Sequence, residues 1–375
     1  MQAIRINTQN AMKERLLILH PYLAPYRLDL YNRLAQDYEL FVFLYGSEAE
    51  KATLGFNLEK LRKAANFHFI EQSKGLYWGR HLLTLQYHSI VKRFRPDIVI
   101  THELGLGTIA MTQLAHHYGF RQYVTIDDSL PMAQNYSRIR FILRKWVYRR
   151  VDGVLVVNNA VRSYLENQTS FLHTRFFCLP IIQDDHIFEQ KVSAAQQRAA
   201  EYKQHYSLGD KKIILFVARM IPLKRPEMLI STFLSYQNKD AVLVMVGNGE
   251  LYEPLRSRYN QHPSIIFQGA LSGTNLYAWF HLANLLVLPS NQEAFGAVVN
   301  EALISGCRVL VSDCAGANML INEENGSVFA TNSQQDFNEK FAHEINIIKK
   351  DCPKKNLMIE PFDMVYQRFL TFIRP

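Results

Sequence analysis

Short apolar runs alternate with amphipathic helical patterns along this chain, and the alternation starts twice. Strands that alternate with crossover helices build a parallel sheet with helices on its faces. Seven runs in the first half are expected to be strands: Leu16–His20, Leu40–Tyr45, Phe67–Ile70, Asp97–Thr101, Gln122–Ile126, Gly153–Val157 and Arg175–Leu179. Six runs in the second half are expected to be strands as well: Ile213–Val217, Ala241–Val246, Ile265–Gln268, Leu285–Leu288, Arg308–Ser312 and Ser327–Phe329. The pattern predicts an α/β chain with two doubly wound parallel sheets.

The chain has 375 residues, enough for two domains that each bury a core. Helical patterns in the first half cover Arg27–Gln36, His81–Arg93, Gly107–His117, Ser137–Arg150 and Ala160–Asn167. The polar stretch Pro180–Gln190 separates the two series. We expect domains at residues 1–182 and 183–355, followed by a closing helix within residues 356–375. Two such sheets predict a cleft lined by the carboxyl ends of their strands, where α/β proteins bind ligands.

Two carboxylates, Glu293 and Glu301, stand in a strand–loop–helix segment of the second domain. The helix is expected to begin near Phe295, Gly296 and Ala297, and a helix N-terminus offers free backbone N–H groups to a phosphate. Acids beside a phosphate site are suited to accept hydrogen bonds from sugar hydroxyls. The alternative is that Glu293 caps the helix and Glu301 is a solvated helix residue.

Two cations, Arg219 and Lys224, follow the strand Ile213–Val217 and precede a helix expected to begin at Pro226. Arginine offers forked donors and lysine a compact charge, so a pair beyond a strand's carboxyl end suits a diphosphate. The alternative is ordinary surface charge on a loop.

The second half resembles the retaining glycosyltransferases of family 4, which have the GT-B fold of two Rossmann-like domains. The resemblance covers roughly residues 211–330. It rests on Ala218-Arg219 with Lys224, on Val246–Glu250, on Ile266–Gly269, on Glu293–Ala302 and on Gly306–Asp313, which come in the family's order and spacing. Ala218 and Arg225 stand where the family usually has glycine. The first half matches less specifically.

The resemblance implies a role for each matching residue. Arg219 and Lys224 would hold the donor diphosphate in place of a metal ion, so neither a metal nor a cofactor is expected. Glu301 would bind the ribose, Glu293 the transferred sugar, and the backbone at Phe295, Gly296 and Ala297 the phosphates or sugar. Gly247 and Gly249 would shape a loop near the nucleotide, and the main chain around Gln268 would contact the base, although glycine after a strand is also ordinary turn chemistry.

Candidates in the first half are weaker. Tyr26 and Arg27 open the first helix and could touch the acceptor or the donor phosphates, or Tyr26 could simply pack. His102 follows the strand Asp97–Thr101 and is a catalytic candidate, although a lone histidine is more often structural. Asp127 and Asp128 follow the next strand, and since adjacent side chains of a strand point opposite ways, only one is expected to face the cleft.

Basic charge is concentrated in the first half: residues 1–180 contain 23 lysines and arginines against 14 acids, whereas residues 181–375 contain 19 against 20. The densest patch, residues 138–150, fits a basic amphipathic helix on an anionic membrane surface or an ordinary helix with its apolar stripe turned inward. A nucleic-acid partner is not expected, because no nucleic-acid fold motif accompanies the charge. Residues 1–10 lack the apolar core of a signal peptide and the four cysteines are scattered, so a cytoplasmic protein, peripheral on the plasma membrane at most, is expected.

The sequence therefore predicts a retaining, metal-independent glycosyltransferase. Its partners would be a nucleotide diphosphate sugar, UDP- or GDP-linked, and a saccharide or lipid-linked acceptor in surface polysaccharide biosynthesis. Two alternatives stay open: a nucleotide-sugar epimerase or hydrolase of the same fold, and a non-catalytic nucleotide-sugar-binding subunit.

Overall fold

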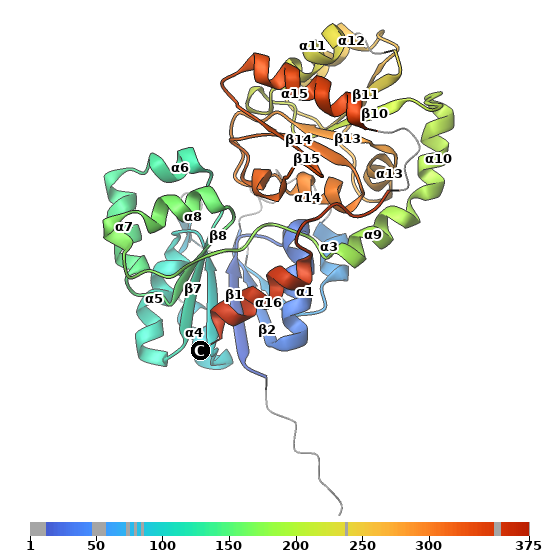
Figure 1. Ribbon diagram of the computed structural model, residues 1–375. Helices are drawn as coiled ribbons and strands as arrows, with labels where there is room; N and C mark the ends of the chain where they lie inside the picture. The colour runs from blue at the N-terminus through green and yellow to red at the C-terminus, as the bar shows by residue number, and fades with distance from the viewer. Residues whose placement is uncertain are drawn as a thin grey trace, which may run out of the picture. The chain divides into compact units, whose positions relative to one another are not determined.

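The computed structural model describes residues 13–46, 58–72, 76–78, 81–83, 86–236, 239–348 and 354–374 (Figure 1). These residues form two compact units. The first unit comprises residues 1–126, 138–155 and 173–175, and the second comprises residues 127–137, 156–172 and 176–375. The residues 1–10 on which the absence of a signal peptide was judged lie outside the described residues.

A seven-stranded sheet runs through the first half of the chain in the order β3-β2-β1-β6-β7-β8-β9. Its strands are β1 (Arg15–His20), β2 (Glu39–Leu44), β3 (His68–Glu71), β6 (Ile98–His102), β7 (Arg121–Ile126), β8 (Gly153–Val156) and β9 (Phe176–Cys178). The pairs β1–β2, β1–β6, β2–β3 and β6–β7 are parallel. The helices are α1 (Pro25–Asp37), α3 (Leu58–Ala64), α4 (Gln86–Phe94), α5 (Leu106–Tyr118), α6 (Leu130–Gln134), α7 (Arg138–Tyr148) and α8 (Asn159–Glu166). All seven predicted strands of this half are confirmed.

A six-stranded parallel sheet forms the second half, in the order β12-β11-β10-β13-β14-β15. Its strands are β10 (Lys212–Val217), β11 (Ala241–Val246), β12 (Ile265–Gly269), β13 (Leu285–Leu288), β14 (Arg308–Ser312) and β15 (Gly326–Phe329). The helices are α9 (Asp185–Ala194), α10 (Gln196–His205), α11 (Pro226–Tyr236), α12 (Tyr252–Tyr259), α13 (Thr274–Leu282), α14 (Ala297–Ile304), α15 (Gln334–Ile347) and α16 (Phe362–Ile373). Two doubly wound sheets confirm the predicted fold class.

The strands of the second sheet are buried because helices cover them. Side chains alternate between the faces of a strand. Ile214 and Phe216 of β10 share an apolar cluster with Leu229 of α11 and with Phe337 and Phe341 of α15, all of them nearly inaccessible to solvent. In the first sheet, a second cluster joins β1, β2 and β6 to α4 and α5. Strands buried in this way show continuous apolar runs, which is why the sequence revealed them.

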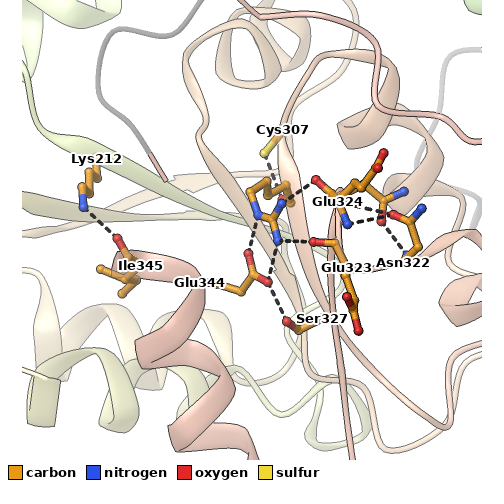
Figure 2. Close-up of polar contacts among 10 residues, drawn as sticks. Lys212, Cys307, Asn322, Glu323, Glu324, Ser327, Glu344 and Ile345 are labelled. Atoms are coloured by element: carbon orange, nitrogen blue, oxygen red, sulfur yellow. Dashed lines mark hydrogen bonds and ion pairs between the residues drawn. The ribbon is translucent and has the colours of Figure 1, made fainter. Parts of the chain in front are cut away.

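A buried ion pair fastens α15 to β14 in the second unit (Figure 2). The carboxylate of Glu344, whose side chain is 0% exposed, accepts hydrogen bonds from Nε and Nη2 of Arg308 at 2.7 and 3.1 Å. The Ser327 hydroxyl also donates to it at 2.6 Å. The Arg308 guanidinium in turn donates to the carbonyl oxygens of Glu323 and Glu324. The pair thus ties helix, strand and turn together through bonds that the apolar pattern does not reveal.

Two predictions about local structure need correction. The helix expected over His81–Arg93 begins at Gln86, and His81–Leu83 is a strand that pairs antiparallel with β4 (Leu76–Trp78) as β5. The polar stretch expected to reach Gln190 becomes helical at Asp185, where the side chain of Asp184 caps α9 by accepting from the Ile187 N–H. Apolar residues over so short a span fit a strand as well as a helix, and an aspartate at the start of α9 is a helix-start signal that the apolar pattern does not include.

None of the helices built from the described residues combines the length and the apolar character that crossing a membrane requires.

Candidate functional site

The candidate donor site lies where the second sheet changes the direction of its strand order. β10 and β13 are parallel neighbours, although β11 and β12 come between them in the chain and are placed on the other side of β10. The loops that leave the carboxyl ends of such a pair diverge and leave room for a ligand. The loop after β10 carries Arg219 and Lys224, and the loop after β13 carries Glu293.

Lys224 and Glu293 are brought together between these two loops. Lys224 ends the short helix η2 (Pro222–Lys224), and the Asn291 N–H donates to the carbonyl of Leu223 at 2.8 Å, which joins the loops. The ammonium of Lys224 donates to the carboxylate of Glu293, with the two side chains 10% and 21% exposed. At the switch point, a cation can bind a phosphate while the neighbouring acid accepts a hydrogen bond from a sugar hydroxyl.

Arg219 is positioned through two glycines of the loop after β11. Gly247 has φ +137°, and a Cβ there would lie 1.9 Å from the carbonyl oxygen of Ala218. A Cβ on Gly249 would lie 2.5 Å from the carbonyl oxygen of Met220. The Ala218 and Met220 N–H groups donate to Val246 and Asn248. The backbone on both sides of Arg219 is therefore held against this loop, while its side chain is exposed. Whether Gly247 also contacts a nucleotide stays a prediction.

Helix α14 begins where Phe295, Gly296 and Ala297 were expected to present backbone N–H groups. Gly296 adopts φ +97°, and a Cβ there would lie 2.8 Å from Cδ2 of Leu288. The Phe295 side chain is 1% exposed and its carbonyl accepts from the Ala317 N–H at 2.7 Å, so this residue anchors the turn. Ala297 and Glu301 lie four positions apart on one face of the helix. The N-terminal N–H groups and the Glu301 carboxylate therefore belong to one rigid element.

Gln183 contacts Glu301, and the sequence analysis missed it. Its side-chain amide donates to Oε1 of Glu301, and its backbone N–H donates to Oδ1 of the neighbouring Asn300 at 2.9 Å. Gln183 is 7% exposed. A lone glutamine in a polar stretch carries no signal of such a contact, because it depends on where the stretch crosses α14.

Gln268 and Arg225 use their side chains within the second unit. The Gln268 amide donates to the Tyr206 hydroxyl at 2.7 Å and accepts from the indole N–H of Trp279 at 3.4 Å. That the Gln268 main chain contacts a base stays a prediction. Arg225, at φ +50°, donates to the Thr331 carbonyl at 2.9 Å.

The first sheet has a switch point of its own, between β1 and β6, and two histidines meet there. His20 ends β1 and His102 ends β6, and their ring centroids are 4.3 Å apart. His20 is 3% exposed; burial, then the nearby charges of His102 and Arg27, lower its pKa well below the usual 6.5. His102 was a candidate from the sequence, whereas His20 was expected only as the last residue of a strand and not as a site residue.

The hydrogen-bond partners assign the tautomer of each ring. A carbonyl oxygen can only accept, so Nδ1 of His20, 2.6 Å from the Tyr22 carbonyl, carries the hydrogen. Thr125 donates its hydroxyl to the Thr101 carbonyl and so accepts from Nδ1 of His102 at 3.0 Å. Both histidines, when neutral, therefore present Nε2 as their basic nitrogen. A catalytic role for His102 stays a prediction.

The remaining candidates differ in accessibility. Arg27 is 3% exposed within α1, whereas Tyr26 is half-buried. Asp128 is 4% exposed and its carboxylate accepts from the Tyr136 hydroxyl, whereas Asp127 is half-buried. The described residues contain no group of three or more His, Cys, Asp or Glu side chains arranged to hold a metal ion.

Comparison with solved structures places this architecture in the GT-B fold. HepE of Anabaena, solved in complex with UDP, superposes with a TM-score of 0.69 over 96% of this chain and 97% of its own, at 16% sequence identity.

Comparison with protein families then places the chain within that fold. Residues 197–353 match the model of the glycosyl transferases group 1, and residues 26–174 match that of glycosyltransferase family 4. The chain belongs to the family 4 glycosyltransferases.

Two curated relatives of this chain are named for different sugar transfers. The alpha-D-kanosaminyltransferase of Streptomyces kanamyceticus is 25% identical over 62% of this chain and 64% of its own length. A GDP-mannose-dependent alpha-(1-6)-phosphatidylinositol monomannoside mannosyltransferase of Mycobacterium tuberculosis is 27% identical over 32% of this chain and 34% of its own. The chain thus spans less than two thirds of either relative.

Proposed function

We propose that the protein transfers a sugar from a UDP- or GDP-sugar to a hydroxyl acceptor, with retention of anomeric configuration and without a metal ion. The observation that carries this proposal is that Lys224, Glu293 and the loop of Arg219 lie together at the switch point of the second sheet. A cation pair there can neutralise a diphosphate, and an acid beside it can orient a sugar.

The chemistry follows from that placement. The bond between the anomeric carbon and the diphosphate oxygen breaks, and Arg219 and Lys224 stabilise the charge that develops on the leaving group. Preorganised donors of this kind contribute on the order of 3–4 kcal/mol each. The acceptor oxygen bonds to the anomeric carbon from the same face, and its proton passes to an oxygen of the leaving diphosphate. Glu293 orients the sugar through its hydroxyls, and Glu301 holds the ribose.

The acceptor is the finer part of the proposal. We assign the acceptor role to residues 1–182, where His102 and one of Asp127 and Asp128 would contact the sugar or its acceptor. A lipid-linked saccharide at the cytoplasmic face of the plasma membrane is supported by the basic balance of residues 1–180 and by a relative named for a phosphatidylinositol glycoside.

Transfer assays decide between this function and its two rivals. The purified chain is incubated with UDP- and GDP-sugars, lipid-linked acceptors and EDTA, and the anomeric configuration of the product is read by NMR. A product that forms in the presence of EDTA and keeps the anomeric configuration of the donor sugar supports the proposal. Free sugar or isomerised donor without an acceptor would favour an epimerase or hydrolase, and tight donor binding with no turnover would favour a binding subunit.

A further inference from the structure

Helix α7 (Arg138–Tyr148) turns large apolar side chains outward. Its buried residues are Arg144, Val147 and Tyr148. Ile139 and Ile142, in contrast, are 80% and 67% exposed. A surface helix of a globular protein ordinarily packs its apolar stripe inward, so the structure decides against that alternative for these two positions.

The exposed isoleucines lie on one face of the helix with an aromatic ring and several cations. Ile139, Ile142 and Trp146 follow one another at spacings of three and four, which places them on one side of a helix. The guanidinium of Arg150 lies 4.8 Å from the centroid of the Trp146 ring. Arg138 and Lys145 stand four and three positions from Ile142, so cations flank the apolar stripe.

The charge of this segment has one sign. Residues 138–150 contain six lysines and arginines and no acidic residue. In the described part of the chain, no ion pair with an acid involves Arg138, Lys145 or Arg149. These cations are therefore available to an external anionic surface.

We propose that α7 docks the protein on an anionic phospholipid bilayer, with Ile139 and Ile142 inserted at the level of the headgroups. Apolar side chains on a helix with cationic flanks match both parts of such a surface, since the acyl boundary takes the apolar groups and the lipid phosphates meet the cations. A nucleic-acid backbone would engage the cations but leave the isoleucines in water. This docking extends the proposed function without depending on the donor site, because α7 contributes no residue to it.

Vesicle flotation of the full chain tests the proposal. The wild-type protein is expected to float with vesicles of phosphatidylglycerol and phosphatidylcholine, to bind pure phosphatidylcholine far less, and to be released by salt. The Ile139→Ser/Ile142→Ser variant is expected to bind at least tenfold more weakly. Leu172→Ser, which replaces an apolar side chain of similar exposure (69%) in the turn after the short helix η1 (Thr169–Phe171), is the matched control and is expected to bind as the wild type does.

A second measurement places the helix at the membrane. Trp146 fluorescence, isolated as the difference between the wild type and Trp146→Phe, is expected to shift to the blue when anionic vesicles are added. The proposal is overturned if the wild type fails to bind anionic vesicles, if the isoleucine variant binds as tightly as the wild type, or if the Trp146 emission does not move. Circular dichroism and nucleotide thermal shifts on every variant separate these results from misfolding, and vesicle binding without nucleotide binding would refute only the proposed function.

Discussion

The ammonium of Lys224 is paired with the carboxylate of Glu293, although 69 positions separate them in the chain. In the proposed site Lys224 faces the diphosphate and Glu293 faces the sugar, so each neutralises the other until the donor arrives. The pair fixes both side chains in a largely buried place, and preorganised charge is what stabilises a transition state without reorganisation. When the donor binds, Lys224 would then contact both the Glu293 carboxylate and the diphosphate, and its side chain would not have to move in from solvent.

The first prediction concerns this pair. Lys224→Met is expected to lower kcat roughly a hundredfold to a thousandfold, because a donor aimed at the leaving group is lost. Glu293→Gln is expected to lower it as well, and the double variant should lose less than the two single losses combined, because each single change leaves the other charge unpaired. Steady-state kinetics on the four proteins measure the coupling, and strict additivity would show that the pair does not act as a unit.

The second prediction concerns the amide of Gln183 and the carboxylate of Glu301. Since the amide occupies Oε1, it orients Glu301 so that the other oxygen can accept from a ribose hydroxyl. Gln183→Met keeps the volume and removes the donor, and is expected to weaken UDP or GDP binding roughly tenfold, the size of one hydrogen bond to a charged group.

The preference for a ribonucleotide over its 2′-deoxy form separates an effect on the orientation of Glu301 from an effect on the stability of the protein. Wild-type protein is expected to bind the 2′-deoxy nucleotide more weakly than the ribonucleotide, and Gln183→Met should narrow that difference. Gln190→Met, an exposed glutamine on α9, is the control and should keep it. Calorimetric titration measures both nucleotides, and an unchanged preference in Gln183→Met would count against the orienting role.

The sequence was informative where structure follows from local pattern. Apolar runs predicted all thirteen strands of the two large sheets, and most of these runs are continuous because strands buried on both faces must be apolar. Loop positions after β10 and β13 were also predictable, since strand order places functional loops at the carboxyl ends. Gln183 and His20 were not, because each gains its importance from a neighbour more than 80 positions away. The pair of Arg308 and Glu344, 36 positions apart, was not predicted either, because a periodic apolar pattern carries no information about which polar side chains meet.

The third prediction concerns Gly247. Alanine there would place Cβ 1.9 Å from the Ala218 carbonyl oxygen, so the loop of Arg219 must move. Gly247→Ala is expected to lower both the thermal midpoint and the affinity for the donor. Gly209→Ala is the matched control, because Gly209 has φ +52° and nothing within 4 Å of a Cβ, and its cost should stay near the roughly 1–2 kcal/mol of a left-handed residue. Differential scanning calorimetry makes the comparison, and equal losses in the two variants would contradict it.

The fourth prediction concerns Glu344. Glu344→Leu would leave the Arg308 guanidinium, 18% exposed, without its carboxylate. Breaking a buried pair from one side costs about 3 kcal/mol or more in the free energy of unfolding. The exposed pair of Arg198 and Glu201 offers the control: Glu201→Leu should cost less than about 1 kcal/mol. Urea unfolding measures both, and a Glu344→Leu protein as stable as the control would show that the network of Figure 2 contributes little.

The fifth prediction concerns His20 and pH. The pKa of His20 is lowered in the folded protein by burial and by the nearby charges of His102 and Arg27, whereas in the unfolded chain it is about 6.5. Below that pH the unfolded state binds more protons than the folded state, so the free energy of unfolding is expected to fall as the pH falls, and to level off above it. His20→Gln keeps a donor for the Tyr22 carbonyl and cannot titrate in this range, so it should flatten the slope between about pH 5 and 6.5. His281, whose pKa burial also lowers, would keep part of it. Urea unfolding of both proteins across this range measures the slopes, and identical slopes would mean that His20 takes up its proton in the folded protein as readily as in the unfolded chain.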